Sequence, residues 1–417
     1  MRILKLTQRT EAELMKVREG QDRTALIAAG RIVAEVRKNG DEALDQWTQK
    51  LDGRDLARDG LWISRKEYRA ARKRVSREFL HAAAHAAENV RHVAERQKPR
   101  NWNLQVEPGV RVGQIVRPIE PIGCYIPGGR LALVSTLLMT VVPAQVAGVR
   151  RIITVCPQPN DELLAVAGML GITALARVGG AQAIAALAYG TKRIARVEKI
   201  FGPGNRYVTA AKQIVNADCA IDLPAGPTEA VVLANRGNPA WIAADLLAQA
   251  EHAPDAGSFL VTTSARFAKR VQAEIEKQLA TLPKENPAQI SIRQSGAILL
   301  ARTWKEACEF VNRFAPEHLS LPEGGASALH AMHSAGTVFV GPLSAQAFGD
   351  YASGSNHVLP TGGWARRRGG LSTEDFVKRI SIQEIDRKGY QRLANDVELL
   401  ARAEGLQAHA NAIEVRR

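Results

Sequence analysis

Hydrophobic positions in the first hundred residues recur at the spacing of a helix. Residues 24–38 carry apolar side chains every three or four positions and stop at Gly40, a residue that commonly ends helices. Ser64 and Glu67 have the spacing of a capping box, which predicts a long helical stretch from there toward Gln97. The first third of the chain is therefore expected to be helical.

Beyond Pro99 the pattern changes to short apolar runs that alternate with helical stretches. The runs predict strands at 112–116, 122–125, 151–155, 174–178, 199–201, 230–233, 259–261, 297–300 and 337–340. Helices are predicted between them at 137–147, 162–170, 181–188, 205–215, 240–250, 267–279 and 304–314. Alternation of strand and helix is typical of parallel, doubly wound sheets, and the strands suffice for two. From Ser372 the pattern returns to helix, most strongly over 391–403.

Length and composition favour a globular protein of two or three domains. The chain has 417 residues, of which 46% are hydrophobic and 24% charged. Its start has no apolar segment typical of a signal peptide, and no run of 18 apolar residues occurs, so no membrane association is expected. The four cysteines lie far apart without a CxxC pair, which argues against disulfides or a thiolate zinc site and favours the reducing cytoplasm.

The formal net charge of +14 could attract nucleic acid or anionic metabolites. Basic residues are spread along the chain, and the densest cluster, Arg366 to Arg368, is only three residues long. No aromatic residues alternate with the basic ones, and no nucleic-acid-binding module is recognisable. We therefore expect no nucleic-acid partner, because attraction of a cofactor with two phosphates is a simpler use of the charge.

Two short stretches combine imidazole with other polar groups. Gln249 and His252 are three positions apart on the last turn of a predicted helix, so they can converge on one point that could hold a metal. The alternative is a histidine that interacts with the helix dipole. Glu317 and His318 place an acid beside an imidazole, which indicates a general acid/base pair or a simple ion pair in a loop.

The segment 349–361 is rich in glycine and polar residues and carries Asp350 and His357. Such a loop is costly to order, so it indicates a site rather than a spacer. Asp350 offers an oxygen ligand and His357 a hydrogen-bond donor or base. Near the end of the chain, Glu404 and His409 pair a carboxylate with an imidazole, although a solvated, fraying helix end is the favoured explanation of these two residues by themselves.

Three glycine-rich turns follow predicted strands, at 125–130, 179–183 and 201–205. No GxGxxG fingerprint occurs, so a standard dinucleotide motif is absent. The last two turns open helices, whose amino ends favour phosphate, and doubly wound sheets bind ligands at strand ends. Tight structural turns remain the alternative for each of them.

Taken together, these stretches closely resemble the histidinol dehydrogenase family, from about Gly40 to Ala412. The segments 315–318 and 349–361 carry the most specific part of the likeness. The resemblance implies one zinc ion per active site, held by Gln249, His252, Asp350 and His409. It implies contacts to the substrate, L-histidinol, at Thr228, Gln249, His252, His318, Asp350, His357, Glu404 and His409. It implies contacts to NAD at Tyr125, Gln182 and Asn205.

The resemblance also implies an architecture of two incomplete Rossmann-like domains with small helical segments at both ends. The large domain would comprise 20–122 and 227–371, the NAD-binding domain 123–226, the N-terminal segment 1–19 and the C-terminal dimerisation segment 372–417. The family forms a homodimer with exchanged segments. Glu404 and His409 would therefore reach the partner's active site, and a lone monomer should be inactive.

The family reaction oxidises one carbon twice, from alcohol through aldehyde to carboxylate, with two NAD and one water. Glu317 and His318 are the expected catalytic residues. The family usually has serine at position 228, and Thr228 retains its hydroxyl. A superfamily relative acting on another primary alcohol, such as a sulfonated or phosphorylated polyol, is one alternative, and a catalytically silent metal-binding protein is another. Nitrogen and oxygen ligands also leave open which divalent ion is bound.

Overall fold

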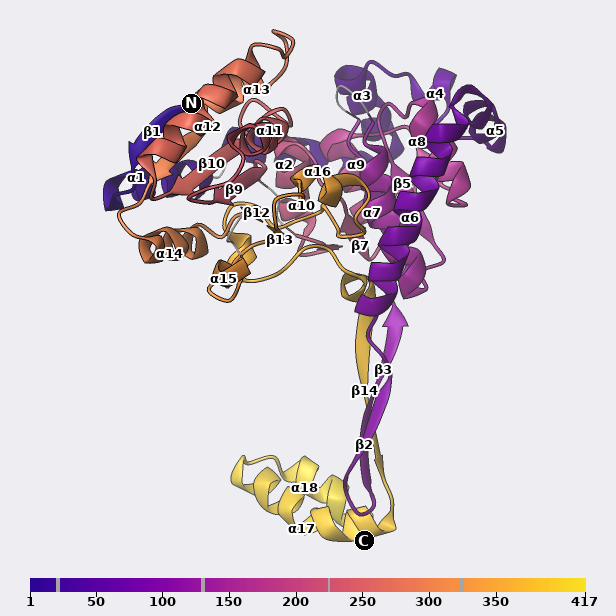
Figure 1. Ribbon diagram of the computed structural model, residues 1–417. Coiled ribbons are helices and arrows are strands. Elements are labelled where there is room, and N and C mark those ends of the chain that lie inside the picture. Colours follow the sequence, from indigo (N-terminus) through magenta and orange to yellow (C-terminus); the bar gives the residue numbers. More distant parts are fainter. Residues whose placement is uncertain (20–22, 129–131, 224–225, 323–325) are drawn as a thin grey trace.

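The computed structural model describes residues 1–19, 23–128, 132–223, 226–322 and 326–417 (Figure 1). Its strands form a six-stranded sheet of order β1-β11-β10-β9-β12-β13 and a five-stranded sheet of order β6-β5-β4-β7-β8. Every pairing in these two sheets is parallel. A third, three-stranded sheet of order β14-β3-β2 is antiparallel. The predicted α/β class with two parallel sheets is confirmed.

The six-stranded sheet is buried on both faces because alternate residues of its strands face two different hydrophobic clusters. Val232 and Leu260 belong to the cluster beneath α11 and α12, whereas Val231 and Val261 belong to the cluster beneath α14. The strands of this sheet are β1 (Arg2–Lys5), β9 (Glu229–Leu233), β10 (Gly257–Thr262), β11 (Ala297–Leu300), β12 (His318–Leu321) and β13 (Thr337–Val340). Its helices are α1 (Gln8–Glu19), α11 (Pro239–Ala250), α12 (Ala265–Leu279), α13 (Ala288–Gln294), α14 (Trp304–Phe314), α15 (Ala326–Leu329) and α16 (Gln346–Tyr351).

The five-stranded sheet comprises β4 (Ile122–Tyr125), β5 (Ile152–Val155), β6 (Leu175–Ala176), β7 (Lys199–Phe201) and β8 (Ala220–Ile221). Its connecting helices are α7 (Val134–Ala147), α8 (Asp161–Met169), α9 (Gly180–Tyr189) and α10 (Arg206–Val215). The N-terminal helices pack on these: α2 contacts α9 and α10, α5 contacts α8, and α6 contacts α7. They are α2 (Arg23–Asn39), α3 (Asp41–Asp52), α4 (Leu56–Asp59), α5 (Arg65–Arg74) and α6 (Arg77–Gln97). The domain limits stay predictions. The resemblance assigns residues 20–122 to the large domain, yet their helices α2, α5 and α6 pack on helices of the predicted NAD-binding domain.

Three expectations about secondary structure are wrong. The helical stretch after Ser64 begins with the predicted capping box but breaks at Val75, because the Ser76 side chain caps a second helix, α6. The N-terminal segment is not purely helical, since β1 pairs with β11 at the edge of the six-stranded sheet. The C-terminal segment contains a nine-residue strand, β14 (Val377–Ile385), where helix was expected.

The antiparallel sheet is a long ribbon that projects from the rest of the molecule (Figure 1). It consists of β2 (Trp102–Glu107), β3 (Val110–Pro118) and β14, with the 112–116 run lying in β3 rather than in a parallel sheet. At its far end the ribbon carries α17 (Arg387–Ala403) and α18 (Gln407–Glu414) (Figure 1). We call β2, β3, β14, α17 and α18 the arm.

Close contacts hold the helix pair to the tip of the ribbon and join the root of the arm to the five-stranded sheet. Gly109, in the turn between β2 and β3, has φ +88°, and a Cβ there would lie 2.3 Å from the backbone nitrogen of Gly389 in α17. Glycine at both positions therefore allows the helix pair to approach the tip of the ribbon. At the root, Phe376 stacks on Phe201 of β7 with ring centroids 4.0 Å apart.

Candidate active site

The predicted acid/base pair lies at the amino edge of the six-stranded sheet. Strands β9 and β12 are parallel neighbours with His318 opposite Ala230, so Thr228 and Glu317, which precede the two strands, are brought together. The Glu317 Oε2 atom accepts hydrogen bonds from the Thr228 hydroxyl at 2.5 Å and from the Glu229 backbone N–H at 3.0 Å. Glu317 is thereby held in one orientation at the start of the strand.

Gln249 reaches the same edge because α11 runs back from the carboxyl end of β9. Its Nε2 atom donates to the Thr228 hydroxyl oxygen at 2.8 Å. The hydroxyl therefore links Gln249 to Glu317, with its proton directed at the carboxylate. The Thr228 hydroxyl thus both donates and accepts a hydrogen bond, and Thr228, Gln249 and Glu317 lie side by side.

The His318 imidazole is buried between two carboxylates. Its Nδ1 atom lies 3.8 Å from Glu317 Oε2, and its Nε2 atom lies 3.8 Å from Asp350 Oδ1. Among the described residues, Nδ1 is a buried nitrogen without a hydrogen-bond partner. Such an atom is costly to bury, so it marks a group poised to act on something else.

Burial and charge raise the pKa values of both members of this pair. Burial raises the pKa of the Glu317 carboxyl to about 7, although His318, Thr228 and the Glu229 backbone oppose the rise. Burial by itself would lower the pKa of the His318 imidazole, but the Glu317 and Asp350 carboxylates outweigh this effect and raise it above its usual value. A carboxyl and an imidazole in such surroundings are suited to general acid/base catalysis.

The loop 349–361 connects this edge to the other half of the molecule. Asp350 lies in α16, and its backbone carbonyl accepts a hydrogen bond from His357 Nδ1 at 2.9 Å. The other ring nitrogen of His357 is 3.2 Å from the hydroxyl of Thr136, at the start of α7. Asn356 donates to the Met139 carbonyl, also in α7. Thr136, which nothing in the local sequence pattern marked out, is therefore a neighbour of the site.

His252 follows the end of α11 at Ala250 and is exposed. Burial has the largest effect on the pKa values of Asp350 and His357, and the charge of His252 is among the smaller influences on both, so His252 lies in the same region as these two residues. Gln249, His252 and Asp350 are three of the four residues expected to hold the metal. Their nitrogen and oxygen donors suit a zinc ion, so the residues present fit the expected metal.

The other two expected residues lie on the arm. Glu404 follows the end of α17, and His409 lies in α18, both exposed at the far end of the ribbon (Figure 1). Within the described ranges, no group of three histidine, cysteine, aspartate or glutamate side chains is placed to hold a metal ion. Gln249, His252 and Asp350 belong to the body of the molecule, at the end of α11 and in α16, whereas His409 lies on the arm.

A cleft of about 970 Å³ lies at the carboxyl end of the five-stranded sheet. The strand order changes direction between β4 and β7, and ligands of doubly wound sheets bind at such a switch point. Tyr125, at the end of β4, and Asn205, the N-cap of α10, both line the cleft. The Tyr125 hydroxyl accepts a hydrogen bond from Gly180 N–H at 3.1 Å. Burial raises the pKa of the Tyr125 hydroxyl.

Gln182 is fully buried beneath the same cleft rather than at its surface. Its Nε2 atom donates to Asp52 at 3.1 Å, and Asp52 lines the cleft. Arg31, Trp47 and Lys50 line it too, and all come from helices far away in the sequence, so no local pattern indicated them. Two residues of the first glycine-rich turn, Gly129 and Arg130, lie outside the described residues.

Known proteins resemble this chain over nearly its whole length. The histidinol dehydrogenase family matches residues 16–417. Histidinol dehydrogenase from Halalkalibacterium halodurans is 45% identical over 93% of this chain and 93% of that protein. Histidinol dehydrogenase from Methanothermobacter thermautotrophicus is 41% identical over 100% of this chain and 99% of that protein.

A solved structure is similar throughout. The crystal structure of histidinol dehydrogenase from Elizabethkingia anophelis has a TM-score of 0.92 at 37% identity, covering 100% of this chain and 98% of that chain. An acetylating aldehyde dehydrogenase from Geobacillus thermoglucosidasius has a TM-score of 0.52 at 12% identity, which shows a shared fold alone. In the part of the chain described, no helix is both long and apolar enough to cross a membrane.

Proposed function

Because the chain belongs to the histidinol dehydrogenase family, we propose that it performs the last step of histidine biosynthesis, the NAD-dependent oxidation of L-histidinol to L-histidine with zinc. The observation that carries the proposal is the buried His318 between Glu317 and Asp350, beside Thr228 and Gln249. This arrangement supplies a base for an alcohol and a second base for water. All four cysteines are free and buried, in keeping with a cytoplasmic enzyme.

Zinc, when bound, would orient the amino alcohol. Two NAD molecules would each accept one hydride. Gln249, His252 and Asp350 would hold the ion together with the partner subunit's His409. Thr228, His357 and the partner's Glu404 would contact the substrate, where a hydroxyl, an imidazole and a carboxylate suit a cationic amino alcohol. Tyr125, Gln182 and Asn205 would form the NAD site, with Gln182 acting from beneath through Asp52.

His318 is the base of both oxidations in this proposal. It accepts the hydroxyl proton of the alcohol as the first hydride leaves, which yields the aldehyde. Glu317 then accepts a proton from the water that adds to the aldehyde, while His318 gives its proton to the aldehyde oxygen, which forms the hydrate and leaves His318 neutral again. His318 next accepts a hydroxyl proton of the hydrate as the second hydride leaves. The product is the carboxylate. Adjacent residues can thus serve both steps without release of the reactive aldehyde.

We infer a homodimer with an active site shared between subunits. The ribbon and its helices expose large apolar side chains, including Leu104, Val106, Ile380, Leu399 and Leu400, of which Leu400 is 67% exposed. An exposed apolar surface of this kind is typical of a protein interface. A second subunit that covered the arm would remove this surface from water and would receive Glu404 and His409.

Purified enzyme should form two NADH per histidinol, and a chelator that removes zinc should abolish this activity. The reason is that the substrate cannot be oriented without the ion. NADH is measured by absorbance, and bound zinc by elemental analysis before chelation, after it and after zinc is restored. Oxidation of an unrelated primary alcohol but not of histidinol would contradict the proposed substrate, and full activity in zinc-free enzyme would contradict the role of the metal.

Changing Glu317 to glutamine should slow oxidation of the aldehyde by about 10²-fold or more, with a smaller effect on oxidation of the alcohol. Glutamine can still accept the hydrogen bond from Thr228 but cannot take a proton from water. Single-turnover assays that start from histidinol or from the aldehyde would separate the two steps. Equal losses in both, or a loss of bound zinc that accounts for the whole effect, would argue against this role.

A further inference from the structure

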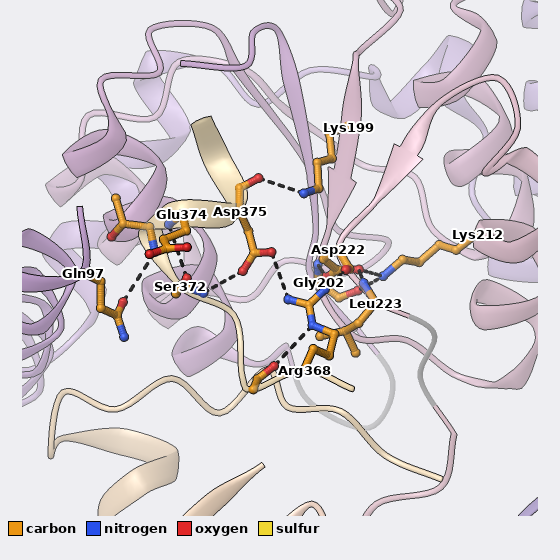
Figure 2. Close-up of polar contacts among 12 residues, drawn as sticks. Gln97, Lys199, Gly202, Lys212, Asp222, Leu223, Arg368, Ser372, Glu374 and Asp375 are labelled. Carbon is orange, nitrogen blue, oxygen red and sulfur yellow. Dashed lines mark hydrogen bonds and ion pairs between the residues drawn. The ribbon is translucent and has the colours of Figure 1, made fainter. Parts of the chain in front are cut away.

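A buried ion pair lies in the five-stranded half of the molecule, outside the acid/base site. Lys212 of α10 contacts Asp222, which directly follows β8, and their side chains are only 3% and 0% exposed (Figure 2). Removing two charges from water is expensive, and apolar residues of similar size usually stabilise a core at least as well. The proposed chemistry does not use either residue. Stability therefore does not account for these two buried charges, whereas their hydrogen bonds to the backbone do.

Both members of the pair bind the backbone of one residue, Gly202. One carboxylate oxygen of Asp222 accepts the Gly202 N–H at 2.7 Å, while the Lys212 ammonium donates to the Gly202 carbonyl at 2.8 Å (Figure 2). The other carboxylate oxygen accepts from Lys212 and from the Leu223 N–H. The Gly202 N–H is thus bound by the negative Asp222 carboxylate, and the Gly202 carbonyl by the positive Lys212 ammonium.

Gly202 begins the turn that leads from β7 to Asn205, the N-cap of α10 at the cofactor cleft. Its φ of +109° is a conformation that favours glycine, and a Cβ there would lie 2.2 Å from the backbone carbonyl oxygen of Tyr125. The turn is therefore packed directly against the strand end that presents Tyr125. Any displacement of Gly202 would move Asn205 relative to Tyr125.

The same cluster extends to the root of the arm. Arg368 donates to the backbone carbonyl of Asp222 and, at 2.9 Å, to the Asp375 carboxylate, while Lys199 of β7 donates to the Asp375 carbonyl at 2.8 Å (Figure 2). Arg368 donates to the backbone carbonyl of Asp222, whereas the two hydrogen bonds to Gly202 come from the Asp222 carboxylate and from Lys212. It therefore offers a control that disturbs the cluster without removing the two bonds that hold the turn.

We propose that Asp222 and Lys212 are positioning residues of the NAD site, which fix the 202–205 turn so that Asn205 and Tyr125 keep their spacing. This inference rests on the proposed place of NAD in the cleft. Charged groups are suited to the task because hydrogen bonds to ionised groups are stronger than neutral ones. A rigid turn lets the cofactor bind without the cost of ordering the loop.

The test is a double variant, Lys212→Met with Asp222→Asn, which removes both charges and leaves neither buried alone. We expect its KM for NAD to rise about tenfold, the equivalent of one or two lost hydrogen bonds. The KM for histidinol, and kcat at saturating NAD, should stay within about twofold of the parent, on the same reasoning that only the cofactor site is loosened. Lys212→Gln with Asp222→Asn keeps a neutral donor and should raise the KM for NAD by less than the methionine variant does, because a neutral hydrogen bond is weaker than a charged one but is not lost.

Arg368→Met is the matched control and should leave the KM for NAD nearly unchanged. An unchanged KM for NAD in a folded double variant would overturn the inference, as would equal losses in all kinetic constants. If the methionine variant does not fold, the glutamine variant decides: a raised KM for NAD beside an unchanged KM for histidinol supports the inference, and a KM for NAD equal to that of the parent contradicts it. Asn205→Ala, measured in parallel, tests separately whether NAD binds in this cleft.

Discussion

Replacing His318 by asparagine is expected to slow both oxidation steps by about 10²- to 10⁴-fold, the usual contribution of a general base. Asparagine can fill much of the space of the imidazole but cannot take up a proton. His318 lies between Glu317 and Asp350 at 3.8 Å from each, so the substitution removes the base from between these two carboxylates. The loss should therefore appear both with histidinol and with the aldehyde as starting substrate.

The measurement is single-turnover NADH formation from each substrate, with bound zinc determined in the same samples. His330→Asn is a suitable control, since His330 is exposed and lies outside the site. A His318→Asn enzyme that carried out both steps at nearly the normal rate would disprove the proposed mechanism. A normal first step with a slow second step would assign the first deprotonation to another group.

Mixing two inactive variants is expected to restore activity. A His409→Asn subunit retains its own acid/base pair, and a His318→Asn subunit retains an intact arm. If the arm completes the partner's site, a mixed dimer contains one site in which both residues are intact. Random assortment should then give about a quarter of the wild-type activity, and a purified mixed dimer about half, because half of its sites are complete.

Coexpression with two different affinity tags would provide the mixed dimer. Each variant alone should be nearly inactive, which is the control for the restored activity. If His409 instead served the site of its own chain, every site in the mixed dimer would lack one residue, and no activity would return. The experiment therefore tests the exchange of arms directly, without reference to a change in stability.

Much of the fold follows from local patterns in the sequence. The strands of the two parallel sheets are short apolar runs because both of their faces are buried, as in β9 and β10. Glycine at position 202 reflects a backbone conformation that other residues rarely adopt. Glu317 and His318 could be paired from the sequence because they are adjacent, and Gln249 and His252 because one helical turn separates them.

The tertiary structure alone decided how these pieces meet. The ribbon strand β14 has only its first residue buried, and it forms by pairing with β3, which lies far away in the sequence. Thr136 approaches His357 and Asp52 approaches Gln182 across separations of 221 and 130 residues. Contacts over such distances depend on how the helices and sheets pack, and no local propensity encodes them.

The sequence by itself thus determined the chemical groups and the elements that carry them. Their assembly at the amino edge of one sheet and the carboxyl end of another was decided by the parallel register of β9 with β12 and of β4 with β7. The position of His409 shows the difference most clearly. Its residue type is suited to bind zinc, but the ribbon holds it away from Gln249 and Asp350, because a strand pair of this length extends rather than folds back.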